Sequence, residues 1–129
     1  MVRFSKPAVV LAACVMLTAC SEPLALDTIQ LGRSLNEDQS VAIQTTTFKP
    51  NETVYVAVLT KARGDGTGAA KWYLGTQLLS EREKQVSFNG AGATEFNLQS
   101  ATGFPEGDYS VELFLDGVSV GRRNFNVVK

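Results

Sequence analysis

The chain has 129 residues, a length that fits one domain of ordinary size, with two cysteines and no histidine. The missing histidine excludes chemistry that needs an imidazole, including a Ser-His-Asp triad, a Cys-His pair and His-ligated zinc or haem. The formal charge of -1 argues against a nucleic-acid binder, which normally has a basic stripe.

Residues 1–19 have the pattern of a secretory signal peptide. Arg3 and Lys6 make the start basic, and residues 8–17 (AVVLAACVML) form a short uncharged apolar run before small residues. This run is far shorter than the roughly 20 residues that a membrane-spanning helix needs. We therefore predict a cleaved signal peptide rather than a membrane span or a core helix.

Residues 17–20 (LTAC) resemble the bacterial lipobox, in which cleavage falls just before the cysteine. The resemblance implies that Cys20 carries a diacylglycerol thioether and a third acyl chain on its amino group. Each buried methylene contributes about 0.8 kcal/mol, so several chains hold a small domain on a bilayer durably. Ser21 in place of Asp implies sorting to the outer membrane. Cys14 leaves with the signal peptide, so no disulfide or metal pair is expected.

Residues 20–28 are expected to form a lipidated tether, and residues 29–129 a single domain. The domain alternates apolar and polar residues with a period of two, which predicts β-strands. A turn is expected at residues 48–51, because Pro50 has no N–H to donate to a ladder. The first strands are expected at Ile29–Arg33, Val41–Thr47 and Thr53–Thr60.

The segment Lys61–Ala70 (KARGDGTGAA) is expected to be an exposed loop, because it has three glycines and no large apolar side chain. The next strand should place Trp72 and Leu74 together on the core face. These later strands are expected at Lys71–Gly75, Thr76–Ser80, Lys84–Phe88 and Ala93–Leu98, followed by a turn at Gly103–Gly107.

The last hairpin has the strongest local signal. The pair Asp116-Gly117 predicts a two-residue type I′ turn, which needs positive φ at both central residues. That turn pairs Leu115 with Val118, and Leu113 with Val120, on the core face. An unbroken register would then bury an arginine and two asparagines, so we predict a β-bulge near Gly121–Arg122.

Seven or eight short antiparallel strands without a helix pattern predict a β-sandwich. Val58, Trp72 and residues 107–111 (GDYSV) resemble the immunoglobulin-like domain. The resemblance implies that Trp72 packs in the core, that Tyr109 closes a corner before the sixth strand, and that Val58 (or Val56) and Val111 occupy the places of the antibody disulfide. It covers roughly residues 40–129 and implies a fold without an activity.

Residues 64–68 (GDGTG) could be interpreted as a phosphate or calcium loop, but the Gly-Lys-Ser/Thr ending is absent and Asp65 is a lone carboxylate. Gly64, Asp65 and Thr67 are instead candidates for partner contact, because binding residues concentrate on loops. Glu81 and Glu83 share a strand face, as a glycosidase pair would, but a solvated strand edge explains them better.

Three further residues are candidates for partner contact. Arg122 and Arg123 could clamp an anionic group; the alternative is that one of them pairs with Glu112 across the hairpin and the other faces water. Phe114 is expected on the outer face of the hairpin, with Tyr55 on the outer face of its own strand nearby. Exposed aromatic side chains on a sheet can mark a partner surface.

These observations together predict a non-catalytic lipoprotein of the bacterial outer membrane, without metal or cofactor, that binds a protein or an envelope polymer through loops and one sheet face. The alternative is a periplasmic inhibitor that inserts the segment Lys61–Ala70 into the cleft of a lysozyme or protease.

Overall fold

The computed structural model describes residues 23–129, so the expected signal peptide and Cys20 lie outside the described residues. Within residues 23–129 the chain forms nine β-strands and no helix. The strands are β1 (Leu26–Leu35), β2 (Val41–Gln44), β3 (Thr47–Phe48), β4 (Val54–Thr60), β5 (Gly64–Leu74), β6 (Gln77–Phe88), β7 (Gly92–Leu98), β8 (Gly107–Leu115) and β9 (Val118–Val127).

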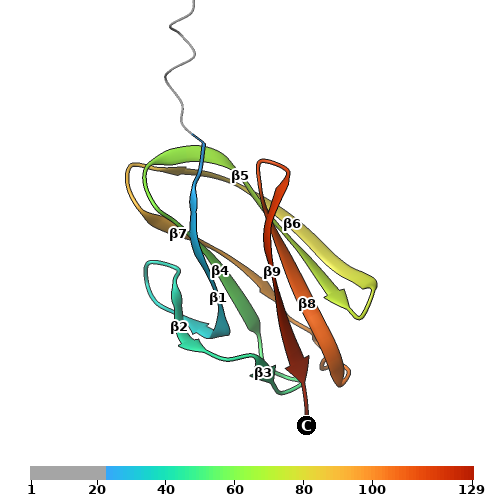
Figure 1. Cartoon of the computed structure of the whole chain (residues 1–129). Helices are drawn as coiled ribbons and strands as arrows, with labels where there is room; N and C mark the ends of the chain where they lie inside the picture. The colour runs from blue at the N-terminus through green and yellow to red at the C-terminus, as the bar shows by residue number, and fades with distance from the viewer. Residues whose placement is uncertain (1–22) are drawn as a thin grey trace, which may run out of the picture.

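The strands form two sheets that face each other (Figure 1). The four-stranded sheet has the order β2-β1-β4-β7, and the five-stranded sheet has the order β3-β9-β8-β5-β6. The predicted all-β sandwich is confirmed. The prediction of seven or eight antiparallel strands was too simple, because there are nine in the described chain and β3 pairs with β9 in parallel.

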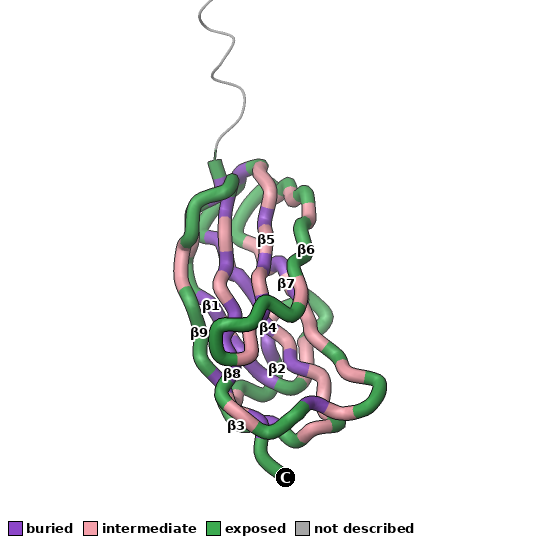
Figure 2. Tube along the Cα trace, turned by 90° about the vertical axis from the view of Figure 1, so that its right-hand side faces the viewer, coloured by how far each residue is buried: buried purple, intermediate pink, exposed green. Residues whose placement is uncertain are grey.

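Apolar side chains from both sheets fill the space between them. Buried residues occur along strands of both sheets (Figure 2). Trp72 lies fully buried at the centre, with Phe125 edge-on at 6.1 Å between ring centroids. Val58 from the other sheet and Val111 from β8 are buried in the same cluster. The core places expected for Trp72, Val58 and Val111 are therefore confirmed. Burial of this apolar area is the main favourable contribution to folding.

Tyr109 closes the corner that leads into β8, as predicted. Its ring is 3% exposed, stacks on Phe125 and meets Phe104 edge-on. Its hydroxyl donates a hydrogen bond of 2.6 Å to the carbonyl oxygen of Pro105, four residues upstream. The apolar ring is thus buried while its polar end is satisfied, and the loop 103–107 is fixed to the start of the strand.

The exposed loop predicted at Lys61–Ala70 is wrong. β5 begins at Gly64, pairs along its whole length with β6, and pairs from Gly68 with β8. Only residues 61–63 remain as a connection. Gly66 permits a close approach, because a Cβ there would lie 2.6 Å from a carboxylate oxygen of Asp116.

Two other predicted boundaries differ from the structure. The strand predicted at Val41–Thr47 is two strands, because the chain leaves the four-stranded sheet after Gln44 and β3 joins the other sheet. Phe48, expected in a turn, is fully buried in β3. The strands predicted at Thr76–Ser80 and Lys84–Phe88 are a single strand, β6, with a bulge opposite the Trp72–Tyr73 step.

The last hairpin has the predicted turn and the predicted Leu115–Val118 pair, but Val118, expected on the core face, is 65% exposed. Asp116 and Gly117 have φ of 52° and 80°, as a type I′ turn requires, and Leu115 pairs with Val118. The predicted register shift occurs one residue earlier than expected, at Val120, so Leu113 pairs with Gly121 instead of Val120. The shift carries Phe125 and Val127 into the core and leaves Arg122 outside.

The domain begins earlier than Ile29, the residue at which it was expected to begin after a tether of residues 20–28. β1 starts at Leu26, Leu24 is buried, and Pro23 forms a parallel bridge with Asp65 at the start of β5. Residues 23–28 therefore belong to the domain. In the described part of the chain, no helix has the length and apolar character to cross a membrane.

The two edge strands β6 and β7 lie on the same side of the sandwich and are joined by a lysine. Lys84 of β6 reaches β7, where its Nζ lies 3.0 Å from the Glu95 carboxylate, and it also donates to the backbone oxygen of Glu95. The same Nζ lies 5.1 Å from the centroid of the Phe96 ring. An inward-pointing charge of this kind discourages pairing of the edge with another chain.

Candidate functional site

The outer face of the five-stranded sheet gathers four of the six residues predicted for partner contact. Asp65 and Thr67 on β5, Phe114 on β8 and Arg122 on β9 all point away from the core, because successive side chains of a strand alternate between faces. Thr67 lies diagonal to Phe114, whose direct partner on β5 is Ala69. The candidate site is therefore a sheet face and not a loop.

Arg122 is held at the centre of this face by three neighbours. Its guanidinium lies 3.3 Å from the Glu112 carboxylate, donates 3.0 Å to the Ser110 hydroxyl, and lies 5.1 Å from the centroid of the Tyr73 ring. The pairing of one arginine with Glu112 across the hairpin is thus confirmed. Glu112 also accepts a hydrogen bond of 2.7 Å from Ser119. The charge of Arg122 is compensated and its position is fixed.

Phe114 is half-buried under a cation instead of standing free. Lys71 Nζ lies 5.0 Å from the centroid of the Phe114 ring and 3.9 Å from a carboxylate oxygen of Glu81. Tyr55 does not lie beside Phe114, because β4 belongs to the other sheet and its outer face is on the opposite side of the sandwich. The expectation that these two aromatic residues form one surface is wrong.

The other two predicted contact residues lie elsewhere. Gly64 is buried where β5 pairs with Phe88 of β6, so it offers no contact surface. Arg123 points to the open side between the sheets, beside Ile29 and Leu31 of β1, and donates 3.0 Å to the backbone oxygen of Arg122. The two adjacent arginines therefore do not form one clamp.

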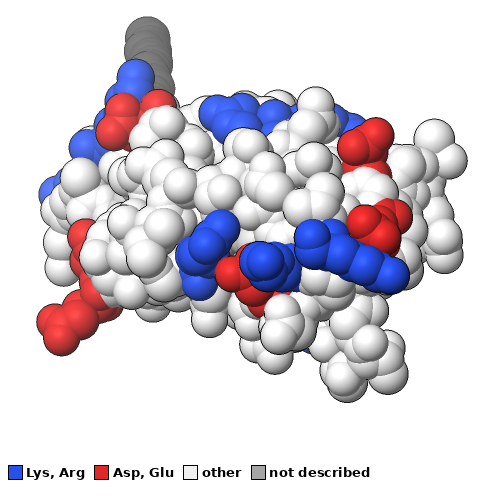
Figure 3. Space-filling model, turned by 90° about the horizontal axis from the view of Figure 1, so that it is seen from below, with Lys and Arg blue, Asp and Glu red and all other residues white. Residues whose placement is uncertain are grey.

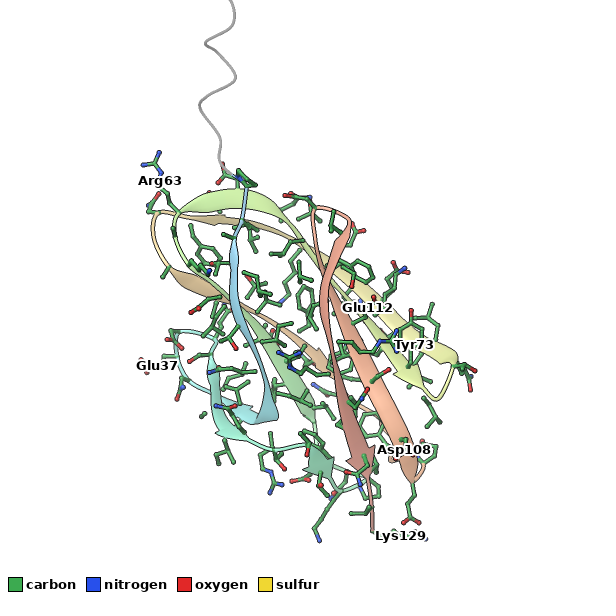
Figure 4. All side chains as sticks on the ribbon, viewed as in Figure 1. Glu37, Arg63, Tyr73, Asp108, Glu112 and Lys129 are labelled. Carbon is green, nitrogen blue, oxygen red and sulfur yellow. The ribbon has the colours of Figure 1, made fainter. Side chains whose placement is uncertain are left out.

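The sequence prediction missed residues that line a hollow of about 570 Å³ on the same face, at the end of the sheet near Gly75. Asp108, Asn124 and Asn126 surround it, and Ser110 forms part of its wall. Tyr73 flanks it through its contact with Arg122. Figure 4 labels Tyr73, Glu112 and Asp108 along β5 and β8. Alternation in the predicted strand Lys71–Gly75 places Lys71 and Tyr73 opposite Trp72 and Leu74, but their position beside β8 depends on the strand order.

The two glutamates considered as a glycosidase pair lie at the edge of the same five-stranded sheet. Glu81 and Glu83 are exposed on the edge strand β6, which confirms a solvated edge. Residues 23–129 contain no group of three or more His, Cys, Asp or Glu placed to hold a metal. Figure 3 shows basic and acidic side chains in small mixed groups on the end of the molecule that it faces.

Two groups in the described chain have shifted pKa values. Burial raises the pKa of the Tyr109 hydroxyl above its usual value of 10.0. Hydrogen bonds from the hydroxyl and the backbone N–H of Ser40 lower the pKa of Asp38, which is exposed in the turn between β1 and β2. Neither group lies on the outer face of the five-stranded sheet.

Comparison with solved structures identifies the architecture. An immunoglobulin-like protein from Pseudomonas aeruginosa matches 85% of this chain over 100% of its own length, with a TM-score of 0.58 and 15% sequence identity. The chain has an immunoglobulin-like fold. The alkylpurine DNA glycosylase AlkC of Pseudomonas fluorescens, bound to DNA containing an abasic site analog, matches 88% of this chain over 32% of its own, with a TM-score of 0.54 and 11% identity.

At such identities these likenesses establish the fold alone. No protein-family model matches the chain, and no curated protein sequence matches it. The immunoglobulin-like fold supports many unrelated functions, so any statement of function has to come from the face described above.

Proposed function

We propose that this chain is a lipid-anchored protein of the bacterial outer membrane that works by binding, without catalysis, through the outer face of its five-stranded sheet. The observation that carries the proposal is the composition of that face. Two half-buried aromatic rings, Tyr73 and Phe114, each lie under a cation on this face, and a polar hollow opens at the end of the face near Gly75. Aromatic and arginine side chains are the residues most enriched in protein interfaces.

The pairing of charges on the face supports binding over catalysis. Arg122 is paired with Glu112, and Lys71 with Glu81. These groups hold the aromatic rings and each other in place, as expected of a preformed contact surface. The partner is a protein or an envelope polymer.

The point at which the described chain enters the domain determines how the proposed anchor at Cys20 would orient it. Pro23, the third residue after Cys20 in the sequence, forms a parallel bridge with Asp65 at the start of β5. Asp108, beside the hollow, lies eight residues before the turn residue Asp116, or about 26 Å along an extended strand. An anchor at Cys20 would hold one end of the domain near the bilayer and point the hollow away from it.

Affinity purification from the cell envelope tests the binding face. We expect the tagged protein to capture a partner that Phe114→Ser loses and Tyr55→Ser keeps. Tyr55 is a matched control, because it is also a half-buried aromatic residue but lies on the four-stranded sheet. Equal retention by both variants, or equal loss, would contradict a role for this face.

Metabolic labelling with palmitate tests the anchor separately. We expect label on the wild-type protein and none on Cys20→Ser, which should leave the membrane fraction. If Cys20→Ser is processed normally and stays in the membrane, the anchor is wrong.

A further inference from the structure

The hollow on the five-stranded sheet exists because small residues lie between larger ones. Ser110 is in the middle strand of the local trio, paired with Tyr73 on one side and Asn124 on the other. Gly75, at the turn after β5, contributes no side chain to the wall. The longer side chains of Arg122 and Asn126 project beside Ser110 and Gly75. The space between them has a volume of about 570 Å³, within the range of small-ligand sites.

Several polar groups around the hollow have hydrogen-bonding capacity that no other group in the described chain uses. In the described chain, the Asp108 carboxylate and the Asn124 amide have no side-chain hydrogen-bond partner. The Asn126 Oδ1 accepts 3.1 Å from the Thr47 hydroxyl, which leaves its NH₂ free to donate. The Ser110 hydroxyl accepts from Arg122 and keeps its own proton for another acceptor. A mixed set of donors and acceptors therefore converges on one space.

The balance of charge selects among ligands. Arg122 is neutralised by Glu112 at 3.3 Å, so Asp108 leaves the hollow with one net negative charge. An anion such as phosphate would meet that charge, and the guanidinium that it could bind is already bonded to Glu112 and Ser110. A hydroxyl group both donates and accepts, so it can donate to Asp108 and accept from the amides of Asn124 and Asn126. A ligand with many neutral hydroxyl groups satisfies this set best.

We infer that the hollow lined by Asp108, Ser110, Asn124 and Asn126 binds a carbohydrate. The inference rests on the proposed binding function and names the class of envelope polymer that the face recognises. Arg122, held over Tyr73 and bonded to Ser110, forms the fixed wall of the site. The edge of the hollow is open, so the site accommodates an internal unit of a chain as well as its end.

Titration of the ¹⁵N-labelled protein with chitotetraose, and separately with maltotetraose, tests the inference by NMR. We expect at least one probe to give saturable shifts confined to the amides of residues 108–110 and 124–126. Asp108→Ala and Asn124→Ala should each raise the dissociation constant about fivefold, the loss of affinity expected for one hydrogen bond. Gln85→Ala is the matched control, because Gln85 is exposed on the same face outside the hollow and should leave binding unchanged.

The inference is overturned if neither sugar shifts these amides, if Gln85→Ala weakens binding as much as Asn124→Ala, or if inorganic phosphate binds there more tightly than either sugar. The envelope capture experiment distinguishes the two levels of the proposal. If neither sugar binds while capture still depends on Phe114, the carbohydrate site fails and the binding face stands. If Phe114→Ser also captures the partner as well as the wild type does, the carbohydrate site and the binding face are both wrong.

Discussion

Replacing Tyr109 with phenylalanine removes one hydroxyl from the corner before β8 and leaves the buried ring in place. That hydroxyl donates 2.6 Å to the Pro105 carbonyl oxygen. A typical hydrogen bond contributes about 1 kcal/mol net to stability, and a larger loss arises when the abandoned partner is buried. Pro105 is exposed, so water replaces the hydroxyl and no such extra loss is expected. We therefore expect the free energy of unfolding to fall by about 1 kcal/mol.

Thermal unfolding followed by far-ultraviolet circular dichroism measures the effect. A loss of about 1 kcal/mol should lower Tm by about 4–6 °C in a domain of this size. Tyr55→Phe is the control, because the Tyr55 hydroxyl has no hydrogen-bond partner in the described chain, and its Tm should change little. If Tyr109→Phe and Tyr55→Phe have the same stability, the corner hydrogen bond does not stabilise the fold and the reasoning is refuted.

The raised pKa of Tyr109 adds a dependence on pH to the same variant. The folded state keeps the phenolic proton above pH 10, while the unfolded chain releases it near pH 10. The stabilisation is therefore fully present below pH 10 and is lost as pH rises through the raised pKa. The wild type should lose stability above pH 10 faster than Tyr109→Phe, and the difference between them should narrow. A constant difference from pH 8 to 11 would contradict this.

Three other predictions concern packing, the turn and the ion pair. Leu113 is fully buried, so Leu113→Ala should cost about 3 kcal/mol in urea unfolding, and a loss below 1 kcal/mol would contradict its place in the core. Gly117 has φ of 80°, so Gly117→Ala should cost about 1 kcal/mol, whereas Gly90→Ala, with open space around it, should stay within about 0.5 kcal/mol. A double-mutant cycle on Arg122 and Glu112 should give a coupling of about 0.5 kcal/mol that weakens in 1 M salt, since the pair is solvent-accessible; a coupling above 2 kcal/mol would contradict that.

The last hairpin could be predicted because its determinants are local. The type I′ turn depends on two adjacent residues, and the bulge follows from the cost of burying a charge two residues farther along β9. The position of the bulge was off by one residue, at Val120. The sequence shows that the register of β8 and β9 must shift. The residue at which it shifts depends on packing, because Gly121 lies against Ile29 of β1.

The first part of β5, residues 64–70, could not be predicted because its determinants are distant in sequence. Gly66 and Gly68 have low strand propensity, and three glycines in five residues are typical of a loop. In the folded chain the Asp116 carboxylate accepts 2.9 Å from the Thr67 backbone N–H, and the Asp116 N–H donates 2.8 Å to the Thr67 carbonyl. This contact spans 49 residues and needs the space that Gly66 leaves.

The candidate site was half predictable for the same reason. Phe114 and Arg122 lie on a hairpin whose register could be derived, so their outward position was expected. Tyr73 and Lys71 lie within the predicted strand Lys71–Gly75, but the order of strands in the sheet is needed to show that they share a face with Phe114. The hollow beside Asp108 depends on which strands are neighbours, and strand order is a property of the whole fold.

The burial of Trp72 gives the protein an intrinsic optical reporter. It is the one tryptophan in the sequence, its side chain is fully buried, and its indole Nε1 has no hydrogen-bond partner in the described chain. An indole without polar neighbours emits at shorter wavelength than a hydrated one, so the fluorescence of the folded protein should be blue-shifted and should move to the red on unfolding. Because Trp72 faces the core from the strand that carries Tyr73 on its outer side, this emission monitors the packing directly beneath the proposed binding face without any added label.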